Sequence, residues 1–219
     1  MWTKCMLASV LGSIALAAPT AMRADEVIAS NLGPGGSYSL LGGIAVDPFQ
    51  DVAVPFTVKG RSNVSLTQID IALTLIRSGF PATTDATVEL LNDSLSGTPG
   101  TTVLGSWNLS NLPGFTVSSV QPSQTISRIT GITLDAGGTY WLAAFGTRID
   151  IIDAWDSASS NQSIGSAALS HNGGGTWFAV NGGNLAFDVL GTRVPEPSSL
   201  LLLASGLLTF VGFARRRSS

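Results

Sequence analysis

The chain has 219 residues, of which 44% are hydrophobic and only 11% are charged, with a formal net charge of −3. Soluble proteins carry roughly 25% charged residues, so this chain is poor in charge, yet it is too apolar to be intrinsically disordered. A single cysteine and a single histidine exclude a disulfide framework within one chain and a Cys/His zinc module. The acidic balance excludes the basic surface that binds nucleic acid.

Residues 1–24 have the pattern of a secretory signal peptide. A basic residue precedes an apolar run over residues 5–18, and small residues then lead to Asp25. The acidic residues that follow carry no helical pattern, which disfavours the alternative of a buried first helix. We therefore predict cleavage near Ala24 and export through the Sec translocon. Cys5 would leave with the signal peptide, so the mature protein would enter an oxidising compartment without disulfide chemistry.

The central segment, residues 25–193, alternates apolar and polar residues in the way that is typical of β-strands. The runs with this pattern are residues 52–58, 69–75, 87–90, 103–107, 127–134 and 139–145. Glycine-containing turn signals separate these runs and follow them, among them residues 59–60, 98–100, 135–138, 172–175 and 181–183. No stretch keeps a helical period of about 3.6 residues. This spacing predicts one all-β domain, an antiparallel β-sandwich.

Two of these runs also predict which side chains are buried. In residues 69–75 the apolar side chains should point inward, with Asp70 and Thr74 pointing outward. Residues 139–145 are more continuously apolar, as expected for a strand that is buried on both faces.

A series of short motifs runs through the same segment, at residues 53–58, 69–75, 86–90, 98–100, 139–142, 174–177 and 185–192. Together they resemble the choice-of-anchor domains of bacterial surface proteins, in particular the R type. Such domains precede several interchangeable surface-sorting tails. The resemblance implies a β-sandwich of unassigned molecular function and brings no catalytic residues with it.

Acidic residues dominate the central segment. Residues 25–194 hold six basic and thirteen acidic residues, a formal charge of −7, which suits solubility but specifies no partner. Asp150, Asp153 and Asp156 recur at every third position, which could indicate an oxygen-lined Ca²⁺ site. The intervening Ile151, Ile152 and Trp155 favour instead a strand at a sheet edge. Both interpretations stay open.

Residues suited to catalysis are scarce. His171 enters a glycine-rich turn, and the chain has no G-x-S-x-G elbow that would pair it with a nucleophilic serine. A surface turn is the favoured interpretation of His171. Glu26 and Glu89 are the glutamates of the domain before the tail, which is a thin supply of carboxylates for glycoside hydrolysis. We therefore expect a protein that is not an enzyme and carries no cofactor or metal.

Tryptophans provide the candidate ligand contacts, because exposed indole rings stack on sugars in many carbohydrate-binding β-sandwiches. Trp141 lies in the most apolar run and is expected in the core. Trp155, flanked by aspartates, and Trp177, after a triple glycine, are the better candidates for glycan contact at the surface. A core position remains the alternative for each of them.

The C-terminal segment is strongly apolar. Residues 198–214 carry no charge, and Arg215, Arg216 and Arg217 follow directly. As a helix, this segment would span about 25 Å, enough to cross a bilayer. The arginines would stay cytoplasmic by the positive-inside rule, which leaves the domain on the far side of the inner membrane.

Val194 is followed by Pro195, Glu196 and Pro197 immediately before the apolar segment. The triplet, the apolar helix and the arginine cluster together resemble the PEP-CTERM sorting signal of Gram-negative bacteria, over residues 194–217. The same tail is also described as the C-terminal motif of an ice-binding protein, but the chain lacks regular threonine-rich ice-binding repeats.

The resemblance implies that exosortase, a membrane-embedded sorting enzyme similar to cysteine proteases, recognises Pro195, Glu196 and Pro197 and removes the tail. Residues 200–213 would be a transient anchor and Arg215, Arg216 and Arg217 the stop-transfer cluster.

These features predict three parts: a signal peptide (1–24), a β-sandwich (25–193) and a sorting tail (194–219). The expected function is that of a non-enzymatic protein of the cell surface or the extracellular matrix. The alternative is a module that binds carbohydrate or exopolysaccharide through Trp155 and Trp177.

Overall fold

The computed structural model describes residues 25–76, 86–114, 124–147, 153–158 and 166–194. Within these ranges the chain forms fourteen β-strands, one short 3-10 helix and no α-helix, which confirms the all-β prediction. The predicted signal peptide and the predicted membrane helix lie outside the described residues. The elements are β1 (Glu26–Ser30), η1 (Pro34–Gly36), β2 (Tyr38–Val46), β3 (Asp51–Thr57), β4 (Val64–Ile71), β5 (Leu73–Leu75), β6 (Ala86–Asp93), β7 (Pro99–Leu109), β8 (Gln124–Ile126), β9 (Thr133–Leu134), β10 (Thr139–Gly146), β11 (Asp153–Ala158), β12 (Ala167–Ser170), β13 (Phe178–Val180) and β14 (Phe187–Arg193).

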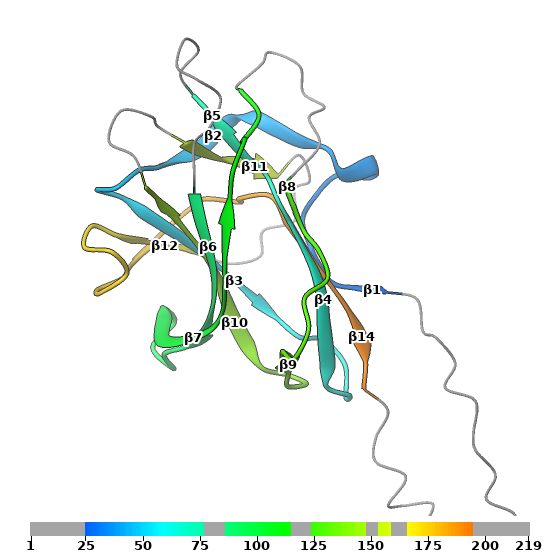
Figure 1. The fold of residues 1–219 in the computed structure, drawn as a ribbon. Coiled ribbons are helices and arrows are strands. Elements are labelled where there is room, and N and C mark those ends of the chain that lie inside the picture. The colour runs from blue at the N-terminus through cyan, green and yellow to red at the C-terminus, as the bar shows by residue number, and fades with distance from the viewer. Residues whose placement is uncertain (1–24, 77–85, 115–123, 148–152, 159–165, 195–219) are drawn as a thin grey trace, which may run out of the picture.

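The strands form three sheets, and the pairing between named strands is antiparallel, as predicted. A five-stranded sheet has the order β1-β14-β4-β8, with β9 also paired to β4, and a six-stranded sheet has the order β13-β12-β3-β10-β6-β7. A three-stranded sheet, β2-β11-β5, lies across one end of the other two (Figure 1). The first and last strands, β1 and β14, lie side by side at one edge of the five-stranded sheet (Figure 1).

The core lies between the two larger sheets. In β3 the alternate residues Val52, Val54 and Phe56 are buried in it, as the period-2 pattern predicts. The ring of Phe56 lies 5.9 Å from that of Tyr140 in its own sheet and 6.1 Å from that of Phe187 in the facing sheet. Phe56 therefore joins the two layers of the sandwich.

Strand β10 is buried on both faces, as predicted. One face contributes Tyr140, Leu142 and Ala144 to the main core. The other face carries Trp141 and Ala143, which belong to a second apolar cluster on the outer side of the six-stranded sheet. Trp141 Nε1 donates a hydrogen bond of 2.8 Å to Asp93 Oδ1, so its polar atom is also satisfied.

Residues 69–75 are not one strand, contrary to the prediction. Strand β4 ends at Ile71 and β5 begins at Leu73 in a different sheet, because the chain crosses between sheets at Ala72. Ala72 N donates to Ala186 O (3.1 Å), and Ala72 O accepts from Asp156 N (2.8 Å). Both faces of this crossing are covered, so Thr74, predicted to point outward, is fully buried and donates to Asp156 Oδ2 (2.8 Å).

The run at residues 127–134 is also interrupted. Strand β8 ends at Ile126, and β9 begins only at Thr133. Arg128 and Gly131 between them have φ angles of 60° and 77°, in the left-handed region that no strand adopts. The periodic pattern predicted that Ile129 faces the core, where it is buried, and that the alternation shifts at Gly131, but it did not predict the turn at Arg128.

Asp156 is a buried carboxyl group at an irregularity of β11, where the register with β2 shifts between Trp155 and Ser157. A Cβ atom at Gly43, on the opposite strand, would lie 2.7 Å from Trp155 O, so only glycine allows this close approach. Burial raises the pKa of Asp156 to about 7, although the hydrogen bond from Thr74 opposes the shift. Burial, and then the nearby Asp156 charge, raises the pKa of Tyr38 to about 12.

We expect the Asp156→Asn substitution to change how stability depends on pH. Between about pH 4 and pH 7 the unfolded carboxyl group is ionised while the folded one keeps its proton, so the free energy of unfolding falls as pH rises. The slope contributed by this group is at most about 1.4 kcal/mol per pH unit. Urea unfolding from pH 4 to pH 8 should show a shallower fall for Asp156→Asn, and a more stable variant above pH 7.

The exposed carboxyl group of Asp135 provides the matched control. Asp135→Asn makes the same change at an exposed position and serves as the reference for the slope of Asp156→Asn. Burial also raises the pKa values of Asp51 and Asp188, so part of the slope will persist in every variant. An Asp156→Asn protein with the full wild-type slope would contradict the assignment.

Candidate functional site

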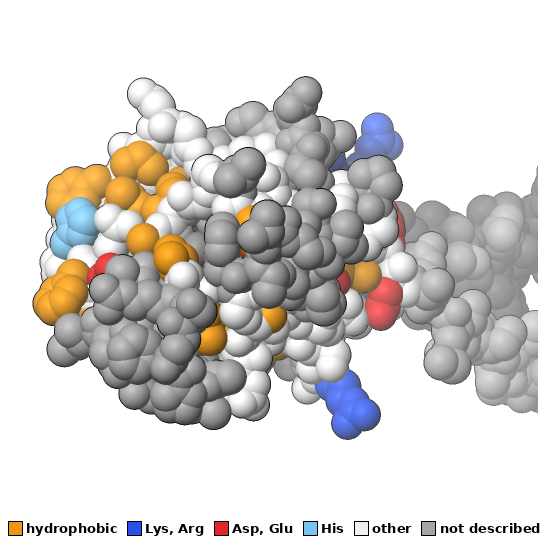
Figure 2. All heavy atoms as spheres, turned by 90° about the horizontal axis from the view of Figure 1, so that it is seen from above, with side chains coloured by type: hydrophobic (Ala, Val, Ile, Leu, Met, Phe, Trp, Pro, Cys, Tyr) orange, Lys and Arg blue, Asp and Glu red, His pale blue; other side chains and the backbone are white. Residues whose placement is uncertain are grey.

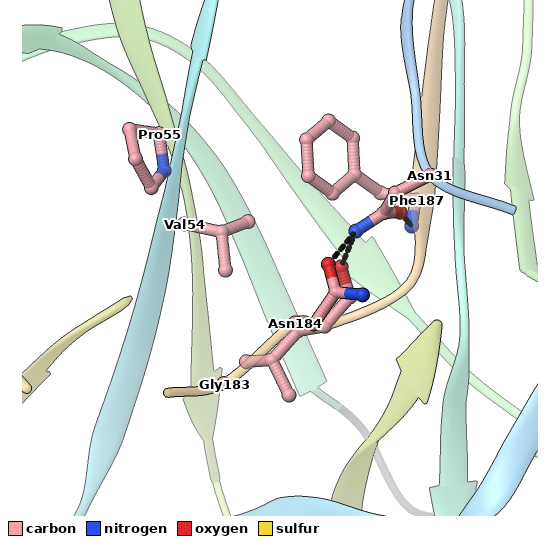
Figure 3. Close-up of a pocket in the computed structure, with 7 residues that line it drawn as sticks. Asn31, Val54, Pro55, Gly183, Asn184 and Phe187 are labelled. Carbon is pink, nitrogen blue, oxygen red and sulfur yellow. Dashed lines mark hydrogen bonds between the residues drawn. The ribbon is translucent and has the colours of Figure 1, made fainter. Parts of the chain in front are cut away.

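A cavity beside Asn31 is too small for an organic ligand. It holds about 10 Å³, the room of one water molecule, whereas small-molecule sites enclose roughly 300–1,000 Å³. Asn31 Nδ2 donates to Leu185 O (2.6 Å) and to Asn184 Oδ1 (3.2 Å), and Asn31 Oδ1 accepts from Phe187 N (2.8 Å). Figure 3 shows these amide groups turned toward one another. Asn31 therefore ties the chain after β1 to the start of β14.

An exposed group of aromatic side chains lies beside the turn between β12 and β13. His171 is exposed in this turn, as predicted, and its Nδ1 lies 2.8 Å from Phe49 O. Phe49 is 65% exposed and Phe178 is 54% exposed, and the rings of His171 and Phe178 are 6.4 Å apart. We call Phe49, His171 and Phe178 the aromatic surface. Figure 2 shows the histidine with hydrophobic side chains on both sides at one edge of the view.

Hydrogen bonds hold the turn that carries this surface. Asp51, which is buried at the start of β3, accepts from Gly174 N (3.0 Å). Asn172 Oδ1 accepts from Thr176 N (2.8 Å) and from Ser170 Oγ (3.0 Å). These hydrogen bonds fix the conformation of the turn at its base. The turn therefore supports the aromatic surface in a defined position.

Trp155 is not at the surface, and its prediction as a glycan contact is wrong. Its side chain is fully buried, and Nε1 donates to Ala186 O (3.1 Å). The flanking Asp156 suggested exposure, but that carboxyl group is itself buried against Thr74. A ring enclosed in this way cannot stack on a sugar.

Trp177 is partly exposed and packs over the outer cluster of the six-stranded sheet. Its ring stands edge-on to Phe145, with 6.2 Å between ring centroids, and precedes Phe178 of the aromatic surface. Its Nε1 is buried and has no hydrogen-bond partner in the described part of the chain. Trp177 therefore has a packing role on the outer face of the six-stranded sheet, and its glycan contact stays a prediction.

Of the three proposed calcium ligands, the described structure places the side chain of Asp156. Asp150 and the side chain of Asp153 lie outside the part that is described, and Asp156 points into the interior. The described ranges hold no group of three His, Cys, Asp or Glu side chains placed to bind a metal ion.

The end of β14 is bonded to two other segments. Arg193 Nε and Nη2 donate to Glu26 Oε2 and Oε1, each at 3.1 Å, and Nη1 donates to Ser62 O (3.2 Å). The next residue, Val194, donates its N–H to Asn63 O (2.8 Å). We call Glu26, Ser62, Asn63 and Arg193 the terminal clamp. It joins the first strand of the domain to the last.

Comparison with protein families identifies the segment that begins at the terminal clamp. Residues 193–217 match the PEP-CTERM protein-sorting motif. The chain carries a PEP-CTERM motif. This agrees with the tail predicted from Pro195, Glu196 and Pro197, and with Arg215, Arg216 and Arg217.

The PEP-CTERM motif begins at the last residue of β14, and its residues from Pro195 onward lie outside the described part of the chain. A search of curated proteins found no match to the chain. The choice-of-anchor and ice-binding resemblances therefore stay predictions. Within the described ranges, the structure has no helix with the length and apolar character of a membrane span.

Sequence reasoning missed Phe49 and Phe178. Both lie beside turn signals, Phe49 after Asp47-Pro48 and Phe178 after the glycine-rich turn, and an aromatic residue in or beside a turn is a usable sign of exposure. That Phe49 O lies 2.8 Å from His171 Nδ1 could not be read from residues that are 122 positions apart.

We expect Trp155→Ala and Trp177→Ala to differ in stability. Removing the enclosed Trp155 ring leaves a cavity and should lower the free energy of unfolding by about 3–5 kcal/mol. Trp177 is partly exposed, so removal of its ring should lower the free energy of unfolding clearly less. Urea denaturation of the two variants measures both losses of free energy. Equal losses would contradict the assignment of Trp155 to the core and Trp177 to its margin.

Proposed function

We propose that this protein is a non-enzymatic component of the cell surface or the extracellular matrix. The PEP-CTERM motif at residues 193–217 carries the proposal, because it supports an exported protein that exosortase sorts. The motif follows a folded all-β domain without any intervening segment. In this proposal the all-β domain is the part that is delivered, and the tail is the signal that directs its sorting.

Each part of the tail has a physical role in this proposal. Pro195 and Pro197 restrict φ and lack N–H donors, which favours an extended segment that presents Glu196 to the sorting enzyme. Residues 200–213 anchor the chain transiently in the inner membrane of a Gram-negative cell. The arginines at 215–217 stay cytoplasmic. The Sec translocon and exosortase are the partners during export.

A Glu196→Ala substitution tests this proposal in cells that contain exosortase. Loss of the carboxyl group should leave the tail attached, so the protein should accumulate at its unprocessed mass in the membrane fraction. Removal of Arg215, Arg216 and Arg217 should also leave the tail attached, but the unprocessed protein should be lost from the membrane fraction, because the tail loses its stop-transfer signal. The intact mass of the protein in each cell fraction is the measurement.

Glu89→Ala, on β6, is the matched control and should be processed normally. Normal removal of the tail from the Glu196→Ala protein would overturn the exosortase proposal.

The second candidate function is the binding of carbohydrate or exopolysaccharide. The aromatic surface favours it, because Phe49 and Phe178 are large apolar side chains that are more than half exposed. Aromatic faces pack against the apolar faces of sugar rings, and Trp177 precedes Phe178 in the chain. This moves the candidate contact from Trp155 and Trp177 to Trp177 and the aromatic surface.

Phe178→Ala and Trp177→Ala should weaken binding to exopolysaccharide from the producing cells about three- to tenfold each, the range expected for one aromatic contact. Pull-down with immobilised polysaccharide and a glycan array are suitable measurements. Leu95 provides the control, since it is an apolar side chain that is 95% exposed in a different turn. If all variants bind the polysaccharide equally and are delivered normally to the surface, the carbohydrate-binding function is contradicted. Only the first proposed function then remains.

A further inference from the structure

Two turns meet at the aromatic surface, and one hydrogen bond joins them. The first turn, residues 47–50, connects β2 to β3 and carries Phe49. The second turn connects β12 to β13 and carries His171. His171 Nδ1 lies 2.8 Å from Phe49 O. A carbonyl oxygen can only accept a hydrogen bond, so the imidazole ring carries a hydrogen on Nδ1 and donates it to Phe49 O.

The other ring nitrogen of His171, Nε2, is available to a ligand. The side chain is exposed, and Nε2 has no hydrogen-bond partner in the ranges that the structure describes. In the neutral ring Nε2 accepts a hydrogen bond, and in the charged ring it donates one. A hydroxyl group both donates and accepts, so it can pair with Nε2 in either state.

Hydrogen bonds within both turns hold this surface in place. Phe49 N donates to Asp47 Oδ1 (2.8 Å), and the backbones of Asp47 and Gln50 exchange hydrogen bonds of 3.0 and 2.9 Å. In the second turn Gly174 N donates to Ser170 Oγ (2.9 Å). The two turns are therefore ordered before a ligand arrives, which lowers the entropy that binding must overcome.

The charges near His171 are negative. Asp47 lies in the first turn, and Asp51, at the start of β3, is close enough to His171 for their charges to interact. In Figure 2 the visible Lys and Arg side chains lie on the opposite part of the view from the histidine. An anionic ligand would approach these carboxylates within a domain of formal charge −7, so an uncharged ligand is favoured.

We propose that His171 Nε2 forms a hydrogen bond with a hydroxyl group of an uncharged polysaccharide. The Phe178 ring, whose centre lies 6.4 Å from that of the imidazole, packs against the apolar face of the same ligand. A sugar unit offers both partners, because it has an apolar face of C–H groups and hydroxyl groups around its edge. The inference rests on the proposed carbohydrate binding and specifies its ligand class and its polar contact.

The His171→Asn substitution separates the two nitrogens of the ring. The asparagine amide can still donate to Phe49 O from the place of Nδ1, but it has no atom at the place of Nε2. Binding to exopolysaccharide from the producing cells should weaken about three- to tenfold, the range of one hydrogen bond. His171→Phe keeps an aromatic ring and should weaken binding by a similar factor. Pull-down with immobilised polysaccharide measures both.

Thr101→Ala is the control, since Thr101 is an exposed polar residue of β7, at the other edge of the six-stranded sheet. Wild-type binding by His171→Asn, or tighter binding by His171→Phe, would overturn the role of Nε2. Failure of the proposed function looks different, because Phe178→Ala would then also bind like the wild type. Urea unfolding of each variant shows whether a loss of binding reflects a loss of folding.

The ligand class has a test that needs no variant. Anion exchange separates the exopolysaccharide into an uncharged fraction and a carboxylate-bearing fraction, and the wild-type protein is offered each. The uncharged fraction should be retained equally at low and at high salt, because its binding involves no ion pair that salt could screen. Preferential retention of the carboxylate-bearing fraction would overturn the ligand class. Retention of neither fraction would contradict the proposed carbohydrate binding itself.

Discussion

The pairing of β14 with both β1 and β4 is the constraint on which the rest of this structure depends. It closes the five-stranded sheet, places Phe187 against Phe56 in the core, and brings the first strand of the domain beside the last. It also determines where the sorting motif leaves the domain. The two ends of the domain are therefore bonded to each other.

The interior contains polar groups where strands change sheets. Asp156, Thr74 and the backbone of Ala72 and Ala186 bond to one another at the junction between the three-stranded and five-stranded sheets. Buried polar groups are costly unless they are bonded, so this junction specifies one arrangement of the strands. Its neutral carboxyl group links the stability of the domain to pH.

The aromatic surface and the core contain the same types of residue. Trp155 and Phe178 are both large aromatic side chains in or beside acidic or glycine-rich segments, yet one is fully buried and the other is more than half exposed. The difference arises from strand pairing: β11 lies between β2 and β5, whereas β13 is at the edge of the six-stranded sheet. Edge strands leave aromatic residues accessible to a ligand.

The sequence by itself determined the all-β class, the buried character of β10 and the sorting tail. Alternation is a local pattern, and so is a Pro-Glu-Pro triplet followed by an apolar segment and an arginine cluster. It did not determine the break at Ala72, the burial of Trp155, the partners of His171 or the pairing of Glu26 with Arg193. Glu26 and Arg193 are 167 positions apart. Contacts of this kind exist only once distant strands have paired, so only the tertiary structure decided them.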